Sequence, residues 1–173
     1  MTYVRDRVAP ASKDYARERR EANRRHLAPD PANPGTRFDG AFDWLRAAAR
    51  YAARRSYRRL EIGERASARC EQIRADAAQV VQGAADEIAA LVPASFRPSP
   101  RRAEIRRASR EAATPKEQLD LARAWLLNAY ALASRYASRD GGAAKARADQ
   151  IRDRAAERLI EWAEEMDADD YGE

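Results

Sequence analysis

The feature that most constrains the fold is a long stretch without proline, between Pro34 and Pro93. Along this stretch, small or apolar residues recur at alternating spacings of three and four, which places them on one face of an α-helix. Asp39 is a suitable N-cap for such a helix. The pattern predicts one long helix over about residues 40–92. A kink or break is expected near Gly63, because glycine costs about 1 kcal/mol in a helix interior.

The composition favours an all-α fold. Alanine supplies 40 residues and arginine 30, and both are good helix formers, whereas Val, Ile and Thr together supply only 14. Leu, Ile, Val and Phe total only 24, so the apolar core must depend largely on alanine. Alanine buries little area per residue, and close helix packing must compensate. We therefore expect an elongated antiparallel bundle, a coiled-coil-like hairpin with two to three return helices, and oligomerisation.

The shorter helices follow from local signals. Thr114, Pro115 and Glu117 form a capping box with proline at the first helical position. This motif predicts a helix over about 115–139. A preceding helix is expected over about 100–112, and a final helix over 143–166 follows the pair Gly141-Gly142. Short connections make antiparallel neighbours, so the last helix should lie along the first part of the long one.

Three regions differ in composition. Residues 1–37 are read as a basic N-terminal arm with a short helix and a proline-rich linker. Residues 38–167 are read as the helical bundle. Residues 168–173 are read as an acidic C-terminal tail. The net charge is +5, but residues 164–173 carry six acids and no base, so residues 1–163 hold +11. A tail of this kind is expected to compete for a basic surface.

A line of arginines on the long helix suggests two hypotheses. Arg46, Arg50, Arg54 and Arg58 recur every four residues in a segment without acids. The last helix carries carboxylates at the same interval: Asp149, Asp153, Glu157, Glu161 and Glu165. One hypothesis pairs the two stripes as a zipper, within one chain or between chains. The other assigns the arginines to phosphate.

A second basic cluster favours phosphate binding. The segment 97–110 holds six arginines and one acid, some of them near a helix N-terminus whose dipole repels cations. The N-terminal helix adds Arg17, Arg19, Arg20, Arg24 and Arg25. A solvated surface of a protein from a GC-rich genome would have a similar composition. The candidate nucleic-acid-binding residues are Arg46, Arg50, Arg54, Arg58, Arg97, Arg101, Arg102, Arg106, Arg107 and Arg110.

Residues that would support catalysis are sparse. His26 is the single histidine, which leaves no partner for a histidine-based metal site. Cys70 lies on the predicted small-residue seam and is read as a buried structural thiol. The segment 141–145 has two glycines and a lysine without the spacing of a phosphate-binding loop. We expect no enzyme activity, no cofactor and no metal. The single cysteine and the lack of long apolar stretches predict a cytoplasmic protein with no membrane partner.

These observations lead to one functional hypothesis and one alternative. The first is a non-catalytic nucleic-acid-associated protein, a subunit or accessory factor of a larger nucleoprotein or viral-type assembly. Its binding to DNA or RNA would be led by charge and by the backbone, because no recognition helix is evident. The alternative is a structural or adaptor protein that joins protein partners through its seam and its charge stripes. Both allow a homo-oligomer or a subunit of a complex.

Overall fold

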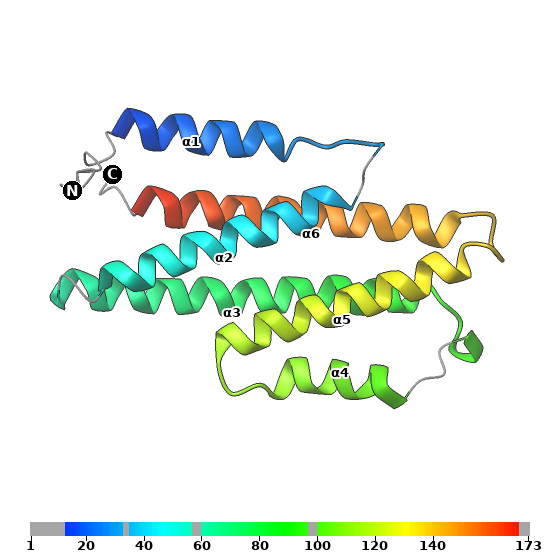
Figure 1. Ribbon diagram of the computed structural model, residues 1–173. Helices are drawn as coiled ribbons and strands as arrows, with labels where there is room; N and C mark the ends of the chain where they lie inside the picture. Colours follow the sequence, from blue (N-terminus) through cyan, green and yellow to red (C-terminus); the bar gives the residue numbers. More distant parts are fainter. Residues whose placement is uncertain (1–12, 33–34, 57–59, 97–99, 170–173) are drawn as a thin grey trace, which may run out of the picture.

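The computed structural model describes residues 13–32, 35–56, 60–96 and 100–169, and side chains within these ranges except those of 13–16, 53–66 and 169. The described residues form six α-helices, one 3-10 helix and no strand (Figure 1). The all-α prediction is confirmed. The elements are α1 (Lys13–His26), α2 (Thr36–Ser56), α3 (Leu60–Ala90), η1 (Ala94–Phe96), α4 (Pro100–Glu111), α5 (Pro115–Tyr136) and α6 (Ala143–Asp169).

The single helix predicted over 40–92 is wrong. α2 ends at Ser56, α3 begins at Leu60, and α3 packs back against α2. The Cys70 thiol lies 3.7 Å from the carbonyl oxygen of Ala49. In one continuous helix these two residues would lie about 31 Å apart. Gly63 lies inside α3, so the break precedes the glycine that was expected to cause it. Folding back lets the thin apolar faces of the two halves cover each other.

The helices form a layered bundle around one core. α3 packs along α5, and α6 packs against α2 and α3 (Figure 1). α4 covers α5 on one side of this group, and α1 lies against α6 on the other. The expected proximity of the last helix to the first part of the 40–92 segment is therefore confirmed as the α2–α6 contact. The elongated coiled-coil-like hairpin is not confirmed.

The core combines a few large side chains with many alanines. The large, fully buried side chains include Phe38, Phe42, Leu45, Ile73, Ile88 and Leu126. Alanines fill the space between them and allow close helix approach. The buried alanines are Ala41, Ala48, Ala49, Ala77, Ala78, Ala84, Ala85, Ala122, Ala129, Ala133, Ala144, Ala148, Ala155, Ala156 and Ala163.

The local signals of the later helices are confirmed. Thr114 has extended backbone angles (φ −124°, ψ 148°), and its hydroxyl oxygen accepts a hydrogen bond from the Glu117 amide at 3.2 Å. Gly141 and Gly142 have φ values of 69° and 93°, which only glycine adopts without strain, and they separate α5 from α6. A side-chain oxygen of Asp140 accepts from the Ala144 amide at 2.8 Å and helps to satisfy the first turn of α6.

The N-terminal helix α1 is docked on the bundle. Leu27, just after α1, is buried in the core and lies against Gly40 of α2. A Cβ atom at Gly40 would come within 2.4 Å of a Leu27 methyl carbon, so glycine is needed for this close approach. Arg37 of α2 donates from Nε to the Leu27 carbonyl oxygen at 2.8 Å. These contacts link the predicted arm to the bundle. The predicted domain boundaries remain a prediction.

Candidate anion-binding site

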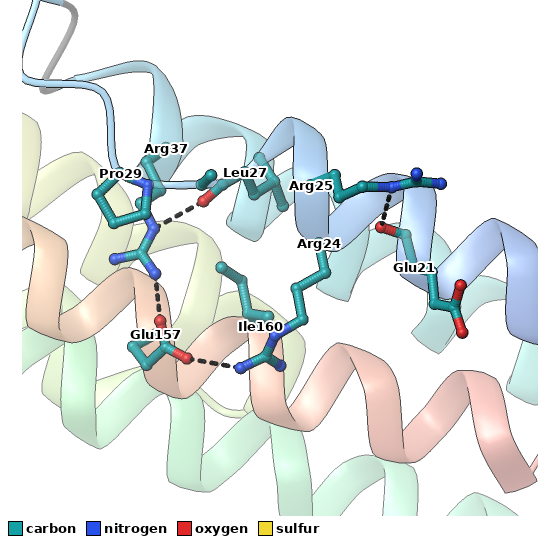
Figure 2. A pocket seen from close by; sticks show the side chains of 9 residues that line it. Glu21, Arg24, Arg25, Leu27, Pro29, Arg37, Glu157 and Ile160 are labelled. Carbon is teal, nitrogen blue, oxygen red and sulfur yellow. Dashed lines mark hydrogen bonds and ion pairs between the residues drawn. The ribbon is translucent and has the colours of Figure 1, made fainter.

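The carboxylate stripe of α6 is neutralised by cations outside the predicted arginine stripe. Arg37 of α2 donates to Asp153 at 2.8 Å and also binds Glu157. Arg24 of α1 donates to Glu157 at 3.1 Å (Figure 2). The other acids of the stripe are bound as follows: Asp149 by Lys145 and the Tyr130 hydroxyl, Glu161 by Arg158, and Glu165 by Arg69.

Within one chain, the zipper is therefore not formed by the two arginines of the stripe whose side chains the structure describes, and pairing between chains stays a hypothesis. Arg46 faces α5, where its Nε lies 4.0 Å from a carboxylate oxygen of Asp120. Arg50 is exposed and has no ion pair with any described residue. The side chain of Arg54 and the whole of Arg58 lie outside the described residues. Both described arginines instead line a cavity between α2, α3 and α5, and neither forms an ion pair with an acid of α6.

The second predicted cluster is partly committed to the fold. Arg106 and Arg110 of α4 both bind Asp86 of α3, the former at 2.8 Å, and the Trp125 indole of α5 donates to the same carboxylate at 3.0 Å. Partial burial alone would raise the pKa of Asp86. The hydrogen bonds from Arg106 and Trp125 and the charges of both arginines outweigh it and lower that pKa. Asp86 thus fastens α4 to α3 and α5.

The remaining arginines of the second cluster are less constrained. Arg107 lies 3.8 Å from Glu111 on the same helix, and both side chains are largely exposed. Arg101 and Arg102 make no ion pair with any residue that the structure describes. Arg97 lies outside the described residues. Of this cluster, Arg101 and Arg102 are the described arginines available to a ligand.

Two arginines of α1, Arg19 and Arg24, hold α1 on α6, whereas Arg17 and Arg25 contact Glu21 of α1 itself. Arg24 binds Glu164 at 2.6 Å as well as Glu157, and the Glu164 hydrogen bond and charge raise the pKa of Arg24. Arg19 lies 2.9 Å from the buried Asp167, which also accepts from the Trp44 indole at 2.7 Å. Between these helices lies a cavity of about 630 Å³, whose apolar wall includes Leu27, Pro29 and Ile160 (Figure 2).

A smaller cavity of about 190 Å³ lies between α2, α3 and α5 and is strongly basic. Four cations line it, and they come from three helices: Arg46 and Arg50 from α2, Arg74 from α3 and Lys116 from α5. Among the lining residues that the structure describes, Asp120 is the single acid, and Leu45, Ala49 and Leu119 are apolar. The lining therefore carries a net charge of +3. We call this the basic cavity.

Sequence reasoning found only half of the cations in the basic cavity. Arg46 and Arg50 were predicted, but Arg74 and Lys116 were not. Arg74 is distant in sequence, and its side chain is only 14% exposed because Glu71 binds it from the preceding turn. Lys116 lies in the first turn of α5, two residues after the capping Thr114. A lysine at a helix N-terminus is electrostatically unfavourable. Its position after the capping box was therefore a sequence signal that could have marked Lys116 as a candidate binding residue.

The described residues show few other candidate sites. Cys70 is buried, and this burial raises the pKa of its thiol. Within the described ranges, no group of three His, Cys, Asp or Glu side chains is arranged to hold a metal ion. In the same part of the chain, no helix is both long and apolar enough to cross a membrane. No protein family, curated protein sequence or solved structure matches the chain.

Proposed function

We propose that the protein is a non-catalytic, nucleic-acid-associated protein that binds the phosphate backbone of DNA or RNA through its basic surface. It would act as a subunit or accessory factor of a larger nucleoprotein assembly. The observation that carries this proposal is the uneven neutralisation of the arginines. Acids of the protein bind Arg19 and Arg24 of α1 and Arg106 and Arg110 of α4. In the basic cavity, Glu71 binds Arg74, and the other three cations have Asp120 as the acid among the described lining residues.

Charge, more than base recognition, would dominate such binding. Lys/Arg contacts to phosphate release counterions, and the logarithm of affinity then falls linearly with the logarithm of salt concentration. Arginine suits this role because its guanidinium stays charged and binds phosphate oxygens in a bidentate manner. The cations near the two predicted clusters that make no ion pair with a described residue include the exposed Arg50, Arg101 and Lys116 and the partly buried Arg102. If each of these four cations contacts one phosphate, the logarithm of the affinity should fall by about three to four units for each tenfold rise in salt concentration.

The test is binding of random double-stranded DNA and single-stranded RNA over about 50–200 mM salt. The variant Arg50→Gln with Lys116→Gln should bind more weakly and lose about one to two units of slope. Its matched control is Arg154→Gln with Arg158→Gln, which also removes two positive charges but from arginines already bound to Glu87 and Glu161. The control should lose less than half as much slope.

Two results would contradict the proposal. Absence of salt-dependent binding to either nucleic acid would rule out the function. Equal losses in the variant and its control would show that only net charge matters, and would remove Arg50 and Lys116 from the interface. The slope itself is independent of stability, so a modestly destabilised variant still gives a usable answer.

The alternative, an adaptor protein, was expected to join its partners through an apolar seam and through charge stripes, and the seam is the part with less support. The predicted seam was to join protein partners, but Phe42, Leu45, Ala49, Cys70 and Ile73 of that seam are buried within the chain's own core. Docking of protein partners through charged surfaces remains a proposal. Size-exclusion chromatography with light scattering would test a homo-oligomer, and a negligible salt slope with nucleic acid would favour this alternative.

A further inference from the structure

We propose that the basic cavity binds one phosphate monoester group, presented as the terminal phosphate of a nucleic-acid strand. This inference deepens the proposed function and rests on it for the identity of the strand. The binding chemistry, that of a tetrahedral dianion, rests on the cavity alone. Three helices supply the cations, so the folded chain, and no single segment, creates the site.

The cations differ in how firmly they are held. Glu71 binds Arg74 and orients its guanidinium, whereas the nearest atoms of Arg46 and Asp120 lie 4.0 Å apart, beyond hydrogen-bond distance. Arg50 and Lys116 are exposed and have no ion pair with a described residue. The cavity therefore has one cation held by a hydrogen-bonded carboxylate and three that are free to close on an anion. Such partial preorganisation reduces the entropy lost on binding.

Lys116 lies where its charge is least favourable without a ligand. It occupies the first turn of α5, where the exposed amide groups already create positive potential. Arg46, Arg50 and Arg74 line the same small space. Like charges gathered in this way repel one another, and Asp120 together with Glu71, which binds Arg74, balances only two of the four cations. A bound dianion would remove most of the excess charge.

The size of the cavity limits the ligand. A volume of about 190 Å³ corresponds to about six water molecules at ~30 Å³ each. That space accommodates one phosphate group with part of its hydration shell. Sites for larger organic ligands measure about 300–1,000 Å³, so a whole nucleotide does not fit inside. A terminal monoester enters end-on and carries up to two charges, whereas an internal diester carries one and needs room for the strand to enter and leave.

Asp120 provides a gain-of-function test. Its carboxylate lines the cavity and would repel a bound phosphate. Removing this charge with Asp120→Asn should raise phosphate affinity by about threefold to tenfold. Removing a cation with Lys116→Gln or Arg50→Gln should lower it by about tenfold. If the cavity does not bind phosphate, Asp120→Asn should not raise phosphate affinity, and Lys116→Gln and Arg50→Gln should not lower it.

The experiment first uses inorganic phosphate as the probe, measured by calorimetry and by the unfolding temperature at constant ionic strength. Phosphate should raise the unfolding temperature above that in chloride, more for Asp120→Asn and less for Lys116→Gln. The control variant Arg154→Gln with Arg158→Gln should respond as the parent does. Equal responses to phosphate and chloride would overturn the inference, and so would unchanged affinity in both cavity variants.

A second arm identifies the source of the phosphate. A single-stranded oligonucleotide with a 5′-phosphate is compared with the same strand ending in a 5′-hydroxyl. The phosphorylated strand should bind about fivefold to tenfold tighter, and Lys116→Gln should abolish the difference. Equal binding of the two strands would overturn the terminal-phosphate assignment while leaving the proposed function intact. Phosphate binding without any binding of nucleic acid would instead contradict the proposed function and confirm the dianion chemistry of the cavity.

Discussion

The carboxylate stripe of α6 and the basic cavity show two different uses of charge. On α6, the acids Asp149 to Glu165 each contact a cation or hydroxyl of the same chain, and these contacts connect α6 to α1, α2, α3 and α5. In the basic cavity, Glu71 binds Arg74, and the other three cations share Asp120. The first arrangement fastens helices together, and its charges balance locally. The second leaves positive charge unbalanced, which contributes nothing to folding and is a property that an anionic ligand could use.

Among the changes that test this difference, Arg37→Met should lower the free energy of unfolding most. Its guanidinium is only 11% exposed and binds Asp153, Glu157 and the Leu27 carbonyl oxygen. Methionine fills similar space but leaves three acceptors unpaired, although water can reach the two half-exposed carboxylates. We expect a loss of about 2 kcal/mol in the free energy of unfolding, measured by urea denaturation.

The matched change in the other region is Arg50→Met. Arg50 is exposed and unpaired among described residues, so its free energy of unfolding should stay within about 0.5 kcal/mol of the parent. Comparable losses at the two positions would contradict the division into structural and available arginines.

A smaller loss of stability is expected at Asp86, which binds arginines of another helix as the acids of α6 do. Asp86→Asn keeps the acceptor for the Trp125 indole but removes the charge that holds Arg106 and Arg110. Because both arginines are about half exposed, we expect a loss of only about 1 kcal/mol at neutral pH. Asp120→Asn, which removes the acid of the basic cavity, should change stability by less than about 0.5 kcal/mol.

The pH dependence of Asp86 has a definite sign. Its pKa is lowered in the folded protein, so its ionised form contributes stability at pH values above the unfolded value of about 3.9. That contribution is lost as the pH falls through the folded pKa. The difference between parent and Asp86→Asn should therefore shrink progressively below about pH 4. A difference that stays constant down to low pH would show that the charge of Asp86 does not stabilise the fold.

Local sequence signals predicted much of the fold. The capping box at Thr114, the glycine pair before α6 and the proline at the start of α4 each fix a helix boundary through near neighbours. The 3-4 spacing of small residues also correctly marked buried positions, such as Ala49 and Cys70. That spacing is the same in one long helix and in two helices that pack together. It therefore could not show that the chain folds back between Ser56 and Leu60.

The candidate site was less predictable, because ion pairing depends on which helix faces meet. A common spacing of four suggested that the arginines near residue 50 would meet the acids of α6. The actual partners of those acids include Arg24 and Arg37, which belong to segments read as arm and linker. Arg74 and Lys116 enter the basic cavity only through the packing of α3 and α5. No motif near Arg74 or Lys116 in the sequence predicts that the two side chains line the same cavity.

The smallest effects come from double-mutant cycles, and these separate the two regions most directly. Arg37→Gln and Glu157→Gln remove the two ends of one contact, so together they should cost less than the sum of the single changes, by about 0.5–1 kcal/mol. Arg50 of α2 and Glu157 of α6 make no contact with each other, so the effects of Arg50→Gln and Glu157→Gln should add within about 0.3–0.5 kcal/mol. Glutamine retains helix propensity and most of the side-chain stem, which limits other changes. Coupling between Arg50 and Glu157 as large as that of Arg37 would restore the zipper and assign Arg50 to the architecture. Additivity would leave Arg50 outside the ion pairs of the fold and free to bind a phosphate in the basic cavity.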